Sequence, residues 1–180
     1  MTKFAAALAI FVLMAGAVFA QKEDAKNEPP PKYYRLDFVV KEVEDGKVIN
    51  GRSYSTIMQS GERSTAQIRT GNRVPVSTGG DKSTVQYYDV GVSIDCRPAP
   101  VERPDFIQLE SEGRLALNIS AEISSIAGSQ EAAPASPPIV RQNKWSSNVL
   151  IPIKKPTLVF SSDDATSKRK MQLELTATPI

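Results

Sequence analysis

The chain has 180 residues, with 22 lysines and arginines against 20 aspartates and glutamates, no histidine and one cysteine. This length suits one domain, and the near-neutral charge excludes the basic surface that nucleic acids require. Without histidine, the chain lacks the commonest metal ligand and general base. One cysteine makes neither an internal disulfide nor a zinc or iron–sulfur site. The composition predicts a non-enzymatic module that binds or assembles, without catalytic residues, cofactor or metal.

Residues 1–20 predict a secretory signal peptide. Lys3 is the only charge, the residues that follow are apolar, and Val18 and Ala20 place small side chains before a cut at Gln21. An uncleaved membrane anchor is the alternative, although the apolar run is slightly short of the roughly 20 residues that span a bilayer. The sequence therefore predicts export.

Two later segments lack bulky apolar residues and are expected outside the folded core. Residues 21–32 are charged and contain three consecutive prolines, which predicts a disordered tether. Residues 128–138 are rich in proline, alanine and serine and predict a long surface loop, because apolar alternation resumes on both sides. The remainder, 33–180, is predicted to form a single domain.

Alternation of apolar and polar residues dominates this domain, as is typical of strands with one buried face. Turn residues separate the runs, and no segment predicts a convincing amphipathic helix. Glycine and asparagine at 50–51 are among the predicted turns. We expect an all-β fold, an antiparallel β-sandwich, with strands at 34–43, 54–58, 65–70, 84–88, 90–96, 115–123, 139–142, 148–153, 157–160 and 171–177. Cys96 lies in phase with the apolar positions and predicts a buried side chain; an intermolecular disulfide is the alternative.

Four segments carry short motifs in a fixed order: Gly-x-x-Val-Pro at 71–75, Tyr-x-Asp-Val-Gly at 87–91, Leu-x-Ile-x-x-Glu-x-Ser-Ser at 117–125, and a segment that opens on Arg141. This series resembles the C-terminal core of the bacterial secretins, the outer-membrane rings of type II and type III secretion and type IV pilus systems. The resemblance covers most of residues 63–180.

The chain also departs from that family. Secretins carry ring-building domains before this core, whereas here only the tether and one short region precede it. Ser-Ser-Asp-Asp at 161–164 replaces the family's Gly-Gly, and the apolar loop that follows is reduced to 165–170. The resemblance therefore implies a stand-alone secretin-like module. Membrane association stays open, but a full channel is not expected.

The resemblance implies a non-enzymatic, exported β module of the bacterial cell envelope, structural or partner-binding in protein secretion or pilus assembly. Its expected partners are further copies of itself or envelope proteins of those systems, in the periplasm or at the outer membrane; secretion from the cell is a further alternative. The competing interpretation is a stand-alone soluble periplasmic or extracellular sandwich that binds a ligand or protein, with an ancestral likeness only. A hydrolase is disfavoured, because a serine nucleophile would lack a histidine base.

The resemblance also implies a gate-like, partner-binding segment, because the matching residues of secretins lead into the hairpins that close the channel. The local sequence agrees: the proline has no N–H for a ladder, and the two glycines predict a flexible tip. An ordinary hairpin loop is the alternative. The segment consists of Val74, Pro75, Val76, Ser77, Thr78, Gly79 and Gly80.

Overall fold

The computed structural model describes residues 32–61, 64–78, 84–100, 103–126, 139–164 and 167–180. The predicted signal peptide, the tether except Lys32 and the predicted loop at 128–138 lie outside these residues. The described elements are β1 (Tyr33–Glu44), β2 (Lys47–Gln59), β3 (Ala66–Thr78), β4 (Thr84–Pro98), α2 (Arg103–Ser111), β5 (Arg114–Ile126), β6 (Val140–Pro152), β7 (Thr157–Asp163) and β8 (Arg169–Pro179). No helix among them is long and apolar enough to cross a membrane.

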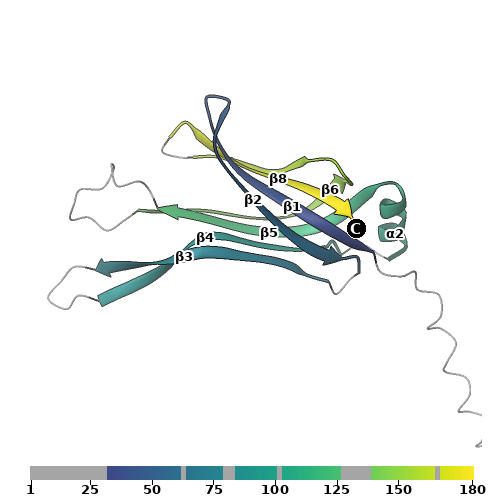
Figure 1. Ribbon diagram of the computed structural model, residues 1–180, viewed down its shortest axis with the longest axis horizontal. Coiled ribbons are helices and arrows are strands. Elements are labelled where there is room, and N and C mark those ends of the chain that lie inside the picture. Colours follow the sequence, from purple (N-terminus) through teal and green to yellow (C-terminus); the bar gives the residue numbers. More distant parts are fainter. Residues whose placement is uncertain (1–31, 62–63, 79–83, 101–102, 127–138, 165–166) are drawn as a thin grey trace, which may run out of the picture. The chain divides into compact units, whose positions relative to one another are not determined.

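The strands form two antiparallel four-stranded sheets, which confirms the predicted all-β sandwich (Figure 1). Sheet A has the order β2-β1-β8-β7, and sheet B has the order β3-β4-β5-β6. Within sheet A the first strand pairs with the last, with Tyr34 opposite Pro179. The turn between β1 and β2 has positive φ angles of 48° at Asp45 and 76° at Gly46, as two-residue hairpin turns require.

The core lies between the sheets and follows from the apolar alternation. Leu36 and Phe38 of β1 and Leu117 and Ile119 of β5 are fully buried. Both sheets contribute to one continuous cluster of buried side chains. At one edge of the sandwich the rings of Trp145 on β6 and Phe160 on β7 lie 5.6 Å apart. Burial of apolar area at about 25 cal/mol per Å² is the dominant favourable term in such a core.

Several strands are longer than the sequence indicates. The runs predicted at 84–88 and 90–96 are one strand, β4, and those at 139–142 and 148–153 are one strand, β6. The turn predicted at 50–51 is wrong, because both residues lie inside β2, opposite Lys41 and Glu42. In each case pairing with a long neighbouring strand overrides the local weakness of glycine or polar residues.

The sequence predicts no convincing amphipathic helix, and the described part of the chain contains one short helix whose apolar face is weakly defined. Helix α2 spans Arg103–Ser111 in the connection between β4 and β5. Its apolar periodicity is weak, so pattern analysis misses it. Phe106 packs against the core cluster, and Asp105 in the first turn complements the helix dipole. Tertiary packing therefore stabilises a helix of only nine residues.

Candidate functional site

The predicted gate-like segment is part of a strand. Residues 74–78 form the last part of β3, with Val74 opposite Tyr88, Pro75 opposite Tyr87 and Val76 opposite Gln86 on β4. Gly79 and Gly80 lie outside the described residues. Val76 is 7% exposed although it lies outside the main core cluster, whereas Val74 is half-buried and Pro75 is exposed. The segment thus combines one buried and one exposed position.

The hydrogen bonds reveal which way each backbone group of sheet B points. The N–H of Gly91 donates to the Ser124 hydroxyl at 3.0 Å, and the N–H of Ala99 donates to the Ala116 carbonyl at 3.0 Å. Both acceptors, Ser124 and Ala116, belong to β5. Because the N–H and C=O of one residue point to the same side of an antiparallel strand, odd-numbered residues of β4 face β5. Even-numbered residues of β4 face β3.

This phase explains the proline in β3. Pro75 is opposite Tyr87, an odd-numbered residue of β4, so its nitrogen lies on the side of β3 that faces away from β4. The missing N–H therefore removes no bond between the two strands. Since β3 is an edge strand of sheet B, the proline occupies one of the few strand positions that tolerate it.

The ladder between β4 and β5 ends halfway along β4. Its register begins at Val92 opposite Ile123 and runs to Pro98, whereas β3 stays paired with β4 as far as Thr84. We call residues 71–78 and 84–91 the β3–β4 arm; Figure 1 shows it diverging from β5 and β6. The arm exposes large side chains: Val85 is 51% exposed, Tyr87 60% and Tyr88 40%.

Two opposed glycines mark the base of the arm. Gly71 is opposite Gly91, and the two backbones approach closely there. A Cβ atom on Gly91 would lie 2.1 Å from the Thr70 carbonyl oxygen and 2.4 Å from the Gly71 Cα. A Cβ atom on Gly71 would lie 2.5 Å from the Val90 carbonyl oxygen. All three contacts are with backbone atoms, so no side-chain movement relieves them, and only glycine fits this crossing.

The side chain of Ser124 forms the hydrogen bonds to β4 at the point where the β4–β5 ladder ends. Its hydroxyl accepts the N–H of Gly91 at 3.0 Å and lies 3.3 Å from the Asp89 carbonyl oxygen, to which it donates. A side chain of β5 thus replaces the backbone of β5 at the last position. This satisfies the polar groups at the fork between the two strand pairs.

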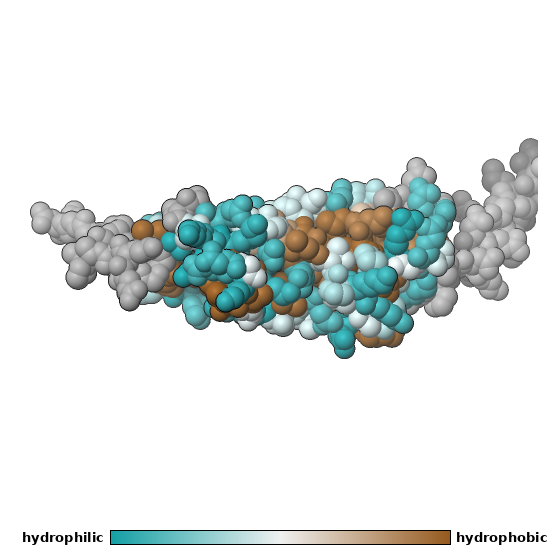
Figure 2. Space-filling view, turned by 90° about the horizontal axis from the view of Figure 1, so that it is seen from above, coloured by the Kyte–Doolittle hydropathy of each residue, from teal (hydrophilic) through white to brown (hydrophobic). Residues whose placement is uncertain are grey.

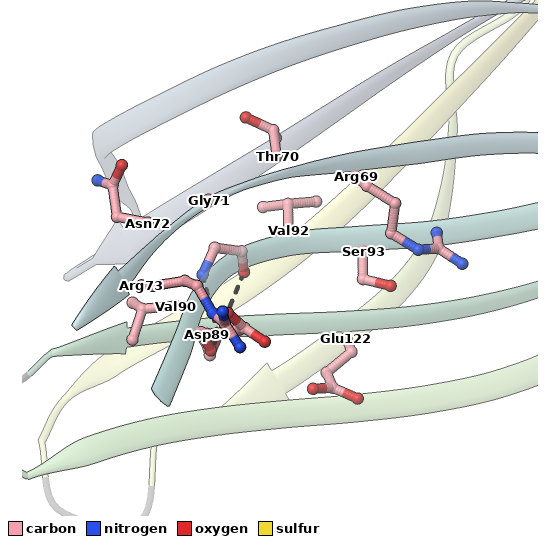
Figure 3. Close-up of a pocket in the computed structure, with 12 residues that line it drawn as sticks. Arg69, Thr70, Gly71, Asn72, Arg73, Asp89, Val90, Val92, Ser93 and Glu122 are labelled. Carbon is pink, nitrogen blue, oxygen red and sulfur yellow. Dashed lines mark hydrogen bonds and ion pairs between the residues drawn. The ribbon is translucent and has the colours of Figure 1, made fainter. Parts of the chain in front are cut away.

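A hollow of about 450 Å³ opens at this fork, and both glycines line it (Figure 3). Its walls combine charged and polar side chains with the apolar Val90 and Val92. Arg73 Nε donates to Asp89 at 3.0 Å, and the Arg73 guanidinium lies 6.0 Å from the Tyr87 ring. On the other side Glu122 accepts from Gln142 at 2.6 Å. The lining consists of Arg69, Thr70, Gly71, Asn72, Arg73, Asp89, Val90, Gly91, Val92, Ser93, Glu122 and Ser124.

The hollow belongs to the polar outer face of sheet B. Arg69 binds both carboxylate oxygens of Asp95 at 2.7 Å, and Asn118 donates to Asn148 at 2.8 Å. Elsewhere the surface is mixed: seen from above, Figure 2 shows a lengthwise hydrophobic band between hydrophilic side chains. The sequence motifs identify Val74 and Pro75 but not the hollow, although the glycines of the motifs at 71–75 and 87–91 line it.

A second polar cluster lies at the end of the domain covered by α2. The side chain of Glu110 is only 5% exposed and forms an ion pair of 3.2 Å with Lys32. Burial and the neighbouring Glu110 charge raise the pKa of Tyr34. The Lys32 backbone is also held, because Ser60 N donates to its carbonyl and its own N–H donates to the Ser60 hydroxyl. This cluster fixes the start of the described domain.

The described residues contain no group of three or more aspartate, glutamate, histidine or cysteine side chains placed to hold a metal ion. Cys96 is buried, as predicted, and burial raises the pKa of its thiol to about 12. A thiol that is neutral and 1% exposed is a poor nucleophile, which counts against the alternative of an intermolecular disulfide.

No protein-family model matches the chain, and no curated protein matches it. Solved structures do. The type II secretin XcpQ of Pseudomonas aeruginosa is 12% identical with a TM-score of 0.49, and the match covers 98% of this chain and 63% of that chain. The type III secretin InvG of Salmonella is 9% identical with a TM-score of 0.45, covering 83% and 63%.

The outer membrane complex of the Klebsiella pneumoniae type II secretion system, which contains PulD, PulS and PulC, is 12% identical with a TM-score of 0.45, covering 83% of this chain and 39% of that one. The chain spans less than two thirds of each of these structures' chains. At 9 to 12% identity the likeness concerns the fold alone. With TM-scores of 0.45 to 0.49, the resemblance of this chain to the secretins stays a prediction from its motifs.

Proposed function

We propose that the chain is a non-catalytic, exported β module of the bacterial cell envelope that assembles with further copies of itself in a protein secretion or pilus system. The observation that carries the proposal is the pair of free edges of sheet B. Edge strands β3 and β6 each have 13 residues, and in the described part of the chain each pairs on one side only. Long free edges are templates for pairing with another chain.

The strand directions suit repeated pairing. Because all neighbours in sheet B are antiparallel, β3 and β6 run in opposite directions. Placing β6 of one copy beside β3 of the next therefore continues an antiparallel sheet. Such a contact joins two different surfaces, so it repeats until a ring closes or a filament forms. The order of secretin-like motifs along β3 to β6 and the apolar residues 1–20 support an envelope location.

The registers of sheet B show which backbone N–H and C=O groups of β3 and β6 point away from the sheet. They belong to odd-numbered residues of β3 and even-numbered residues of β6. Gln67→Pro and Ser146→Pro each remove one outward N–H and leave the bonds to β4 or β5 in place. Gln67→Thr and Ser146→Thr are the matched controls, because they keep the N–H.

The experiment measures the mass of the full chain in mild detergent by analytical ultracentrifugation. We expect the unaltered chain and both threonine variants to form high-mass assemblies, and each proline variant alone to remain monomeric. An equal mixture of the two proline variants should stop at dimers, because each retains one sound edge. A monodisperse monomer of the unaltered chain would refute the proposal and favour the stand-alone binding module.

A further inference from the structure

The β3–β4 arm has a free edge that differs from the two outer edges of sheet B. The register of β4 with β5 contains no residue before Val92 among the described residues. Odd-numbered residues of β4 direct their N–H and C=O groups away from β3. Ser124 binds two of these groups, the N–H of Gly91 and the carbonyl of Asp89. Val85 and Tyr87 therefore present a donor and an acceptor each toward the fork.

The spacing of these groups selects the kind of partner. Donors and acceptors that recur at every second residue of a strand match the backbone of another extended chain. Main-chain pairing of this type provides affinity, and pockets for alternate side chains provide specificity. The arm offers both features, because the hollow lies directly at the base of the free edge.

The side chains beside this edge define the chemistry of the partner. Val85 and Tyr87 lie on the outer face of the arm and Tyr88 on the opposite face, and all three are at least 40% exposed. Aromatic and β-branched side chains are the favoured cross-strand neighbours of such residues. An extended segment with alternating valine or threonine and aromatic residues therefore complements both faces.

The hollow adds a preference for one aromatic side chain with a polar tip. Val90 and Val92 line the hollow beside Gly71 and Gly91, which carry no side chains, so a ring can lie there against apolar atoms and backbone (Figure 3). Asp89, whose side chain is 80% exposed, and Glu122 offer carboxylate oxygens at opposite walls. A tyrosine hydroxyl at the rim would donate to either of them.

From these observations we infer that the free edge of β4 between Val85 and Asp89 binds an extended, tyrosine-containing segment of another protein as an added strand, with the tyrosine in the hollow lined by Gly71 and Gly91. This site uses neither outer edge of sheet B, so it is independent of assembly between copies. The Gln67→Pro variant should bind the segment as the unaltered chain does, which separates the two proposals experimentally.

The first test uses a fluorescently labelled peptide of alternating threonine and valine that ends in tyrosine, titrated with the full chain in mild detergent. We expect saturable binding by fluorescence anisotropy. N-methylation of every second amide, on the side that pairs with β4, should weaken binding at least tenfold. N-methylation of the other set is the control and should change it less than twofold. Equal binding of both methylated peptides, or no saturable binding, would overturn the inference.

The second test locates the site. Tyr87→Pro removes an N–H that faces the fork and should abolish binding, whereas Tyr87→Thr keeps the N–H and should retain it. Ser93→Tyr places a ring in the hollow. It should weaken binding of the tyrosine-ended peptide severalfold but leave binding of an alanine-ended peptide unchanged. If Tyr87→Pro unfolds the domain, the methylated peptides decide alone. A dimer of the unaltered chain that displaces the peptide would assign the edge to a second copy and overturn the inference.

Discussion

The two halves of β4 belong to one strand and have opposite surroundings. From Val92 to Cys96 the alternate side chains are at most 4% exposed, because β5 pairs with this half and the apolar face of sheet A covers it. From Val85 to Val90 the strict alternation is lost, because Tyr87 and Tyr88 are adjacent; β5 is absent there, and Tyr88, on the same face as Ile94, is 40% exposed. Alternation predicts a strand with two distinct faces. Only the neighbouring elements decide whether the apolar face becomes core or surface.

The largest expected difference between the two halves is in core packing. Ile94→Ala should lower the free energy of unfolding by about 3 kcal/mol, since it leaves a cavity in the core. Tyr88→Ala, on the same face of the same strand, should lower it by only about 0.5 kcal/mol, as at an exposed position. Chemical denaturation of both variants measures the difference. Similar losses would mean that the arm is part of the core.

The boundary between the halves should be nearly as sensitive. Gly91→Ala places a Cβ atom 2.1 Å from the Thr70 carbonyl oxygen and should cost about 2 kcal/mol through the backbone shift that follows. Gly51→Ala in β2 is the matched control, because a Cβ atom there meets nothing within 4 Å. It should be neutral or stabilise by about 0.5 kcal/mol. A harmless Gly91→Ala would show that the crossing can open.

The buried half should also give the domain a characteristic alkaline sensitivity. The pKa of Cys96 is raised to about 12, above the value near 8.5 of an unfolded thiol. Its contribution to stability is therefore complete below about pH 8.5 and is lost as the pH rises toward 12, at about 1 kcal/mol per pH unit. Urea unfolding between pH 8.5 and 10 should show a steeper decline for the unaltered chain than for Cys96→Ala. Parallel declines would mean that the thiol ionises in the folded state.

The smallest effect is expected at the fork. Ser124→Ala leaves the Gly91 N–H without its acceptor and should cost about 1 kcal/mol. Hydrogen exchange of the Gly91 amide should accelerate, because the hydroxyl no longer protects it. Ser146→Ala on the exposed part of β6 is the control and should alter neither quantity. An unchanged Gly91 exchange rate would indicate that a water molecule or the β5 backbone replaces the hydroxyl.

The sequence predicts the buried faces well because burial in a sandwich follows the two-residue period. Leu117, Ile119 and Ala121, alternate apolar residues of the strand predicted at 115–123, are all buried. Strand ends are predicted less well, since the pairing partner sets them. The gap predicted at residue 89, between the strands at 84–88 and 90–96, does not exist, because β3 pairs with β4 throughout this range and Arg73 stands opposite Asp89. Helix α2 is missed because its packing against the core through Phe106 depends on where the sheets place it.

The candidate site is harder to predict for a related reason. Pro75 and Val74 are recognisable from their motif, and their place on an outer strand agrees with the proline's chemistry. The hollow depends instead on residues from three strands, including Ser93 of β4 and Glu122 of β5. Their proximity follows from the registers between strands, which no local pattern encodes. Single motifs thus locate an element, whereas the site requires the assembled sheet.

The pairing of β1 with β8 has a consequence for the order of folding. Leu36 pairs with Ala177 in the middle of sheet A, so the two strands that meet there are separated by almost the whole domain in sequence. Closing so long a loop is entropically costly and slows folding. A chain that emerges from its N-terminus first, from a ribosome or across a membrane, can form the β1–β2 hairpin early. It completes the centre of that sheet only after its last strand has emerged.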